Sequence, residues 1–144
     1  MNVLVSACLL GLPCRYDGRA KPCPAVLALR TRHTLIPVCP EQLGGLPTPR
    51  PAAEWQGERI VNRESRDVTA EYLRGAEGAA RLAGLCGCRW AVLKERSPAC
   101  GCAGIYDGSF SGTLVPGRGS AARALQAAGV RVLGESMLSL LPEE

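Results

Sequence analysis

Apolar residues gather in four short runs along the chain, at residues 2–6, 34–38, 89–94 and 130–133. Val, Leu, Ile or Ala fill most positions of each run, and Gly, Pro or polar residues flank it. Short apolar runs between turn signals are typical of strands that are buried on both faces. The pattern therefore predicts four buried strands.

Between and after these runs, the spacing of apolar residues changes to that of helices. Asp67 or Thr69 can cap the longest helical pattern. Proline in the first turn and glycine after the last turn mark the other helices. The predicted helices span residues 22–32, about 67–85, 120–128 and 135–141.

The alternation of strands and helices predicts an α/β fold. Right-handed crossovers would make it a single-domain, Rossmann-like parallel sheet of four strands flanked by helices. The segments after strands two and three, residues 40–66 and 97–119, are long, irregular and rich in Gly and Pro. Long loops inside a compact domain are usually functional, so we expect residues 40–66 to form a lid or a substrate wall.

The composition fits one domain over residues 1–144 with a real core, since 47% of the residues are hydrophobic and the mean hydropathy is +0.05. The first strand has no basic segment before it, and no apolar run reaches membrane-spanning length. We therefore expect a cytoplasmic protein without a membrane partner. The net charge of +4 is mild and the Arg residues are scattered, which argues against nucleic acid as a partner. The oligomeric state stays open.

Eight cysteines in 144 residues are the unusual feature of the composition. In a chain without a secretion signal they indicate metal ligation or catalysis rather than a disulfide framework. No Cys-x-x-Cys pair occurs, so the signature of thioredoxin-like proteins and common zinc ribbons is missing. A four-thiolate zinc site could form from Cys86-Gly87-Cys88 with Cys100-Gly101-Cys102. Alternatively, Cys86 and Cys88 could be small buried residues.

Three cysteines follow predicted strands: Cys8, Cys39 and Cys100. The carboxyl ends of parallel strands meet at one edge of a sheet, where ligands bind, so we expect the three thiols to converge. They could hold an iron–sulfur cluster or another metal, with Cys14 as a substitute or a neighbour. Three thiolates on a four-iron cluster would leave one iron open for catalysis. Three nearby basic residues could offset the charge of a cluster or could be ordinary solvated side chains: Arg15, Lys94 and Arg96.

Two other motifs fit less well. The phosphate loop of a low-molecular-weight tyrosine phosphatase needs five residues between Cys and Arg, whereas six separate Cys8 from Arg15. Because this loop wraps a phosphate with consecutive amides, one extra residue is a serious departure. Residues 117–122 match a relaxed dinucleotide fingerprint but do not directly follow a strand.

Five groups of motif residues occur in order: Ser-Ala-Cys-Leu-Leu-Gly at 6–11 with Cys-Arg-Tyr-Asp-Gly at 14–18, Cys-Pro-Glu at 39–41 with Gly-Gly-Leu-Pro-Thr-Pro-Arg at 44–50, Asp-Val-Thr at 67–69, Leu-Lys-Glu-Arg-Ser-Pro-Ala-Cys-Gly at 93–101, and Tyr-Asp-Gly at 106–108. In these motifs the chain resembles the thiouracil desulfidase family over nearly its whole length. The resemblance implies a 4Fe-4S cluster held by three cysteines, whose free iron takes sulfur from a thiolated pyrimidine without net redox change. The products would be uracil and hydrogen sulfide.

Carried over by motif, the cluster ligands are Cys8, Cys39 and Cys100. The resemblance also implies two catalytic residues, Glu41, which would activate water or move its proton, and Ser97, which would donate a hydrogen bond. Glu41 could instead cap the turn after Pro40. Ala99 stands where the family usually has serine, a departure that leaves the ligand intact but bears on substrate contacts.

The loops at 44–50 and 104–112 are expected to shape the pyrimidine pocket. Three residues within them could contact polar atoms of the ring or support the loops: Arg50, Tyr106 and Asp107. We expect His33 at the surface and Trp55 and Trp90 in core or lid packing. The second class of function that the residues allow is a non-catalytic zinc- or thiolate-binding module.

Overall fold

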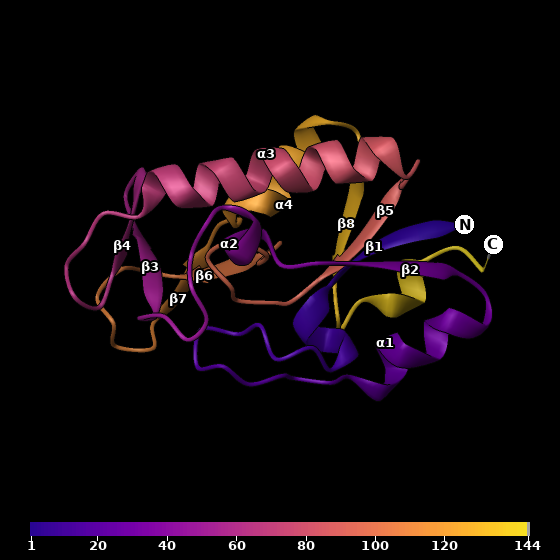
Figure 1. The fold of residues 1–144 in the computed structure, drawn as a ribbon, viewed down its shortest axis with the longest axis horizontal. Helices are drawn as coiled ribbons and strands as arrows, with labels where there is room; N and C mark the ends of the chain where they lie inside the picture. The colour runs from indigo at the N-terminus through magenta and orange to yellow at the C-terminus, as the bar shows by residue number, and fades with distance from the viewer. Residues whose placement is uncertain (144) are drawn as a thin grey trace.

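The computed structural model describes residues 1–143. Three short 3₁₀ turns accompany its helices and strands. Figure 1 shows the strands of the main sheet at one end of the molecule and two small hairpins at the other. None of the helices within the described residues is long and apolar enough to cross a membrane. The elements in chain order are β1 (Asn2–Ser6), α1 (Pro24–Ala28), β2 (Thr34–Val38), α2 (Pro40–Leu43), β3 (Ala53–Gln56), β4 (Arg59–Asn62), α3 (Thr69–Leu85), β5 (Trp90–Leu93), β6 (Gly104–Tyr106), β7 (Leu114–Pro116), α4 (Ser120–Ala127) and β8 (Arg131–Gly134).

The main sheet has the strand order β2-β1-β5-β8, and every neighbouring pair is parallel. Ser6 pairs with Val38, and Leu93 pairs with Gly134, so the carboxyl ends of the strands lie at one edge. This sheet confirms the prediction of a parallel, four-stranded α/β fold. It also places the segments that follow β1, β2 and β5 side by side.

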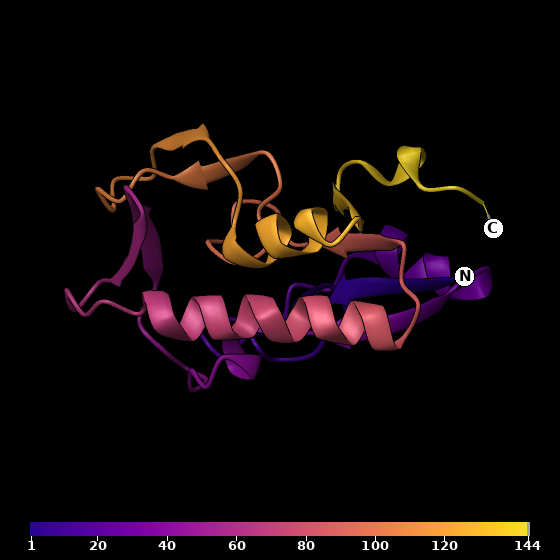
Figure 2. The same ribbon diagram turned by 90° about the horizontal axis from the view of Figure 1, so that it is seen from above.

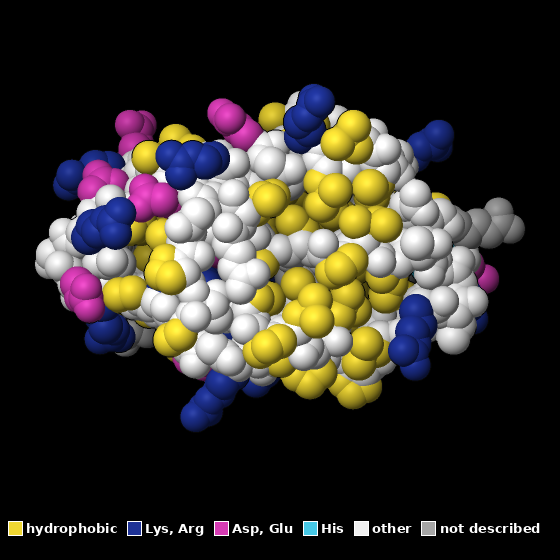
Figure 3. Space-filling view, viewed as in Figure 1, with side chains coloured by type: hydrophobic (Ala, Val, Ile, Leu, Met, Phe, Trp, Pro, Cys, Tyr) yellow, Lys and Arg dark blue, Asp and Glu magenta, His cyan; other side chains and the backbone are white. Residues whose placement is uncertain are grey.

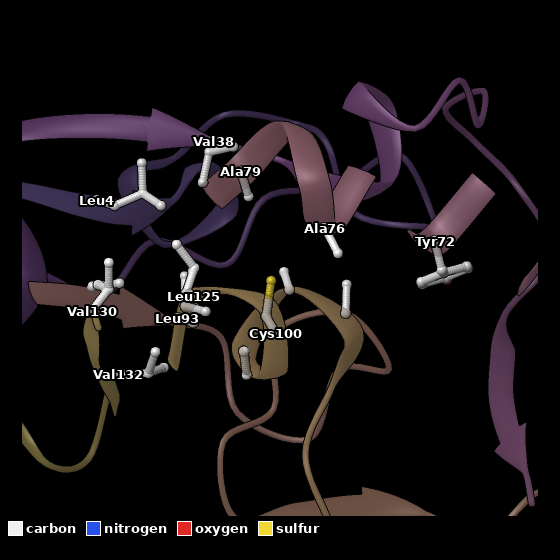
Figure 4. Close-up of a cluster of buried hydrophobic side chains, with 14 of the residues drawn as sticks. Leu4, Val38, Tyr72, Ala76, Ala79, Leu93, Cys100, Leu125, Val130 and Val132 are labelled. Carbon is white, nitrogen blue, oxygen red and sulfur yellow. The ribbon is translucent and has the colours of Figure 1, made fainter. Parts of the chain in front are cut away.

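Alternate residues of each strand point to opposite faces of the sheet. Leu4 and Ala91 belong to the core cluster that α3 and α4 cover, whereas Val3, Val5 and Val92 belong to the cluster on the other face. Helix α1 and the 3₁₀ turns near both ends of the chain complete that second cluster. Figure 2 shows α3 and α4 packed side by side, and Figure 4 shows the apolar side chains between them and the sheet. β1, β5 and most of β8 are therefore buried on both faces, as their apolar runs predict, whereas the edge strand β2 is only partly buried.

The two long segments contain regular structure that the sequence did not reveal. Residues 40–66 form α2 and the antiparallel β3–β4 hairpin, and residues 97–119 contain the antiparallel β6–β7 hairpin. Strands of three or four residues are too short for a clear alternation of apolar and polar positions. The predicted terminal helix at 135–141 is wrong, because only a 3₁₀ turn forms at Leu138–Leu140 before Pro142.

The face seen in Figure 3 carries a concentration of hydrophobic side chains over the β2 end of the molecule, while most of the acidic side chains in view lie at the hairpin end. β2 is an edge strand, and its Leu35 and Ile36 are half-buried. Pro37 has no backbone N–H to offer a further strand, a common way to protect a sheet edge from pairing.

Helices α2 and α3 cross at a contact between two glycines. A side-chain carbon on Gly44 would overlap the Glu71 carbonyl, and one on Gly75 would overlap the Pro40 carbonyl. Only glycine lets the two backbones approach this closely. The contact fixes the short helix that carries Glu41 against the long helix.

Candidate active site

A cleft of about 540 Å³ opens at the carboxyl edge of the sheet. Cys8 lies in the turn directly after β1, Cys39 precedes the first residue of α2, and Cys100 follows β5. The structure thus brings the three cysteines singled out in the sequence to one cleft, together with a fourth. The cysteines that line it are Cys8, Cys14, Cys39 and Cys100.

The surroundings favour the neutral form of three of these thiols, those of Cys14, Cys39 and Cys100. The Cys39 thiol donates a hydrogen bond to the Cys14 carbonyl (3.6 Å), and a hydrogen bond with the Cys14 side chain together with burial raises the pKa of Cys39 far above its ordinary value. A hydrogen bond from Cys39 lowers the pKa of Cys14, but the Cys8 thiol and burial outweigh it, so the net shift is upward. Burial raises the pKa of Cys100 to about 12. Bound metal would have to displace these protons.

The donor set fits an iron–sulfur cluster better than a single ion. Clustered soft thiols are the ligands that iron–sulfur clusters use in proteins. Across residues 1–143, no three His, Cys, Asp or Glu side chains lie at the spacing that one metal ion needs. A polynuclear core is larger than one ion and calls for ligands further apart. The cleft offers four thiols of this kind, from segments that follow three different strands.

The alternative four-thiolate zinc site is wrong. Cys86 and Cys88 lie in the turn between α3 and β5, which precedes the strand. Cys100 and Cys102 follow the same strand at its carboxyl end. The two pairs are therefore separated by the length of β5. Cys88 is buried, and burial raises the pKa of its thiol, as expected for a small apolar core residue.

The Glu41 carboxylate lies in the cleft and is held by two side chains. Tyr72, buried in α3, donates its hydroxyl hydrogen to Glu41 Oε2. Arg50 approaches both carboxylate oxygens, with Nε 3.4 Å from Oε2 and Nη2 3.3 Å from Oε1. Glu41 has these side-chain partners rather than a role in capping the turn after Pro40. Its carboxylate is thus oriented before any substrate binds.

Arg50 is buried and does not line the cleft, in contrast to the possibility that it contacts the substrate ring. Besides Glu41, its guanidinium donates hydrogen bonds to the carbonyls of Pro47 (3.1 Å) and Cys14 (2.9 Å) and to the Thr48 hydroxyl (3.0 Å). It therefore ties the loop at residues 44–50 to the loop that carries Cys14.

Ser97 shapes the turn that delivers Cys100. Its Oγ accepts the backbone N–H groups of Ala99 and Cys100, each at 3.1 Å. Ser6, at the end of β1, accepts the backbone N–H of Lys94 at 2.8 Å and so joins the ends of β1 and β5. Hydrogen bonds from Ser6 and Ser97 lower the pKa of Cys100, although burial outweighs them. Sequence reasoning missed Ser6, whose signal is a hydroxyl at the end of an otherwise apolar strand.

The three basic residues noted in the sequence all line the cleft: Arg15, Lys94 and Arg96. Two of them have acidic partners, because Lys94 Nζ lies 3.0 Å from Glu135 Oε2 and Arg15 Nε lies 3.8 Å from Asp17 Oδ1. The acidic partners therefore reduce the positive charge that Lys94 and Arg15 would present to a cluster.

The remaining candidates divide between the cleft and structural roles. Tyr106 lines the cleft, whereas Asp107 supports its own loop by accepting hydrogen bonds from Ser109. The expectation of a surface His33 is wrong: it is 6% exposed, at the amino end of β2 and 3.5 Å from the N-terminal amine. Trp55 is buried, and its ring N–H donates to the Pro98 carbonyl (2.9 Å), as expected for a packing residue. Trp90 is half-buried against the core.

Comparisons with known proteins agree with this geometry. The family model for 2-thiouracil desulfurase matches residues 3–137. The curated protein "Uncharacterized protein YbbK" of Bacillus subtilis (strain 168) is 37% identical over 147 residues, which cover 95% of this chain and 97% of YbbK. The solved structure of the 4Fe-4S-dependent thiouracil desulfidase TudS has a TM-score of 0.90 and 46% identity, over 96% of this chain and 93% of that one. The chain belongs to the 2-thiouracil desulfurase family.

Proposed function

We propose that this protein is a 4Fe-4S-dependent enzyme that converts thiouracil and water to uracil and hydrogen sulfide. The observation that carries the proposal is the gathering of thiols from the ends of β1, β2 and β5 in one cleft beside an oriented carboxylate. Membership of the 2-thiouracil desulfurase family and the likeness to TudS support it. A phosphatase-like reaction has no comparable support.

Cys8, Cys39 and Cys100 would hold the cluster, because each follows a different strand of the sheet and lines the cleft. When bound, the cluster supplies an open, Lewis-acidic iron with affinity for soft sulfur. Cys14 is a neighbour of the ligands in this proposal, since it interacts with two of their thiols.

Glu41 would act on the water that attacks the thiocarbonyl carbon. A carboxylate held by Tyr72 and Arg50 keeps a fixed direction, which a general base needs in order to meet its proton. The oxygen of the water becomes the carbonyl oxygen of uracil, and its two protons leave with the sulfur as hydrogen sulfide. No electrons are exchanged. The Ser97 oxygen accepts two backbone N–H groups, and its hydroxyl hydrogen is directed toward the Cys100 thiol. In the proposal this hydrogen, held at the edge of the cleft, is the one that Ser97 would donate to the substrate.

The substrate of this proposal is a small thiolated pyrimidine rather than a nucleic acid. Three acidic side chains line the cleft beside its basic ones, and two of the basic side chains, Arg15 and Lys94, are paired with acidic partners. Ligand thiols stay reduced in the cytoplasm, which is the compartment that we propose.

The test is anaerobic reconstitution with iron and sulfide. We expect a brown protein that converts 2- or 4-thiouracil to uracil and releases one sulfide per uracil. Cys39→Ala should lose both colour and activity, whereas Cys86→Ala, at the other end of β5, should keep both. A wild-type protein that stays colourless after this treatment would overturn the proposal.

Two further variants separate catalysis from metal binding. Glu41→Gln should keep its iron and lose sulfide release, and Cys14→Ala should keep its iron because Cys14 is not a ligand. A zinc- or thiolate-binding module without catalysis would behave differently. Elemental analysis would find zinc, and Glu41→Gln would change nothing measurable.

A further inference from the structure

A buried glutamate holds the tip of the β6–β7 hairpin over the cleft. Glu54, on β3, is 8% exposed, and its Oε1 accepts the backbone N–H groups of Gly108 (3.0 Å) and Phe110 (3.1 Å). Gln56, two residues further along the strand, donates from its amide to the Gly108 carbonyl (2.9 Å). The first hairpin therefore clamps the second through three hydrogen bonds.

Phe110 has an unusual backbone conformation within this clamped loop. Its φ is 55°, in the left-handed region that residues other than glycine, asparagine and aspartate seldom adopt. Such a conformation costs free energy and persists only where the surroundings impose it. Here the hydrogen bond from Phe110 N–H to Glu54 is one of the contacts that hold the residue in place. Strained residues of this kind concentrate at functional sites.

The Phe110 side chain is placed where a ring could meet a substrate. It lines the cleft that holds the thiols and Glu41. The Arg63 guanidinium carbon lies 5.1 Å from the centroid of the Phe110 ring, within the range of a cation–π contact. Arg63 comes from the turn after β4, so the first hairpin region also steadies the ring itself. Phe110 is the only phenylalanine in the chain.

We propose that Phe110 is a substrate-binding residue whose ring contacts the face of the pyrimidine, and that Glu54 is the positioning residue that holds it there. The inference rests on the proposed function and adds the determinant of ring recognition. Thiols and carboxylates recognise the sulfur and the water, but neither recognises a flat heterocycle. A phenyl ring does, because every base presents a π-face on which an aromatic side chain can stack.

A stacking contact of this kind makes a definite kinetic prediction. It forms with thiouracil in the ground state and persists in the transition state, so its loss raises KM and leaves kcat nearly unchanged. It also forms with uracil, which has no sulfur to bind iron. The affinity for uracil therefore reports the contact without any contribution from the reaction.

The experiment compares variants of the reconstituted holoenzyme after equal iron content has been verified. Phe110→Leu should weaken uracil binding in calorimetry by about 10-fold, the size of one base–aromatic stack, and raise KM for 2-thiouracil by a similar factor. Phe110→Tyr, which keeps a ring, should bind uracil nearly as the wild type does. Ser111→Ala, an exposed change in the same loop, is the matched control and should alter neither constant.

The Glu54 variants test the positioning role. Glu54→Gln keeps an oxygen that can accept both N–H groups and should retain uracil affinity, whereas Glu54→Ala should lose it as Phe110→Leu does. Wild-type affinity for uracil in Phe110→Leu would overturn the inference, whatever the activity. A wild-type holoenzyme that binds uracil through Phe110 but releases no sulfide from thiouracil would instead overturn the proposed function and leave the ring contact standing.

Discussion

The hydroxyl of Tyr72 links the hydrophobic core to the carboxylate of Glu41 in the cleft. Its ring is buried in the cluster beneath α3, and its O–H reaches Glu41. Burial raises the pKa of Tyr72 far above its ordinary value, so the hydroxyl stays protonated and remains a donor at neutral and moderately alkaline pH. The orientation of Glu41 therefore depends on a hydrogen-bond donor that keeps its proton.

Tyr72→Phe removes this donor and keeps the packing of the ring. A hydrogen bond to a charged group is worth about 1.5–3 kcal/mol, so we expect kcat for sulfide release to fall by about 10-fold or more. The iron content and the melting temperature in the cluster-free form should show that the fold persists. An unchanged kcat would mean that Arg50 alone orients Glu41.

His33 gives the protein a pH dependence that has nothing to do with the cleft. Burial, and then the nearby N-terminal ammonium group, lower the pKa of His33 in the folded state. The unfolded chain consequently binds a proton more readily than the folded chain as the pH falls below the ordinary histidine pKa of about 6.5. Protonation of His33 therefore does not lower the free energy of unfolding above that pH, and lowers it progressively below that pH.

The change that isolates this effect is His33→Gln. Urea denaturation of the cluster-free protein at pH 7, 6 and 5 should show a steeper loss of unfolding free energy in the wild type than in the variant. Carboxylates contribute equally to both slopes, so the difference reports His33. Parallel curves would contradict the assignment.

Sequence reasoning located Cys8, Cys39 and Cys100 correctly in one cleft, because each follows a strand of the parallel sheet, and parallel strands end at one edge. It did not find Glu54 or Phe110. Their importance comes from a contact between residues 56 positions apart. Nothing in the local pattern of either segment records such a contact.

At the scale of elements, the crossing of α2 and α3 is the joint that sets the position of Glu41. Gly75→Ala would push the added methyl group into the Pro40 carbonyl. We expect a loss of about 1–3 kcal/mol in unfolding free energy, as for other overpacked sites. Sulfide release should also fall, since Glu41 moves with α2.

Gly84→Ala, in the last turn of the same helix, is the matched control. A side-chain carbon at Gly84 would have nothing within 4 Å, so this change should stabilise the protein by up to about 1 kcal/mol through helix propensity alone. Chemical denaturation of both variants measures the contrast. Equal effects at the two glycines would show that α2 and α3 do not depend on their close contact.

The parallel strands could be predicted and the hairpins could not, for a physical reason. β5 and the central residues of β1 are apolar because both of their faces are covered, and the sequence records that directly. β3 and β6 are three or four residues long and owe their stability to tertiary contacts. Trp55 on β3, for example, donates a hydrogen bond to the Pro98 carbonyl, and the Arg123 guanidinium carbon lies 4.1 Å from the centroid of its ring. Local periodicity contains no trace of such partners.

Over the whole molecule, the sheet and the hairpins contribute different parts of the cleft. Figure 1 shows both termini at the end opposite the hairpins, and the cleft lies between the sheet edge and the hairpins. The sheet supplies the thiols and the hairpins supply the wall with Phe110. A metal core at the sheet edge would add a further link between the segments after three strands, which hydrogen bonds of Ser6 and Arg50 already join. Loading should therefore stabilise the entire fold, not just the loops.

Anything that binds the folded chain but not the unfolded chain raises stability by mass action, by about 2.7 kcal/mol when the free ligand is 100-fold above its dissociation constant. We expect the anaerobic holoprotein to melt at least about 5 °C above the protein from which a chelator has removed iron. Cys86→Ala should show the same difference. Cys8→Ala and Cys100→Ala should melt at one temperature with or without iron, because each has lost a strand from the link. If the wild-type protein melts at the same temperature with and without iron, the metal is held by loops alone. The sheet edge then does not organise the site.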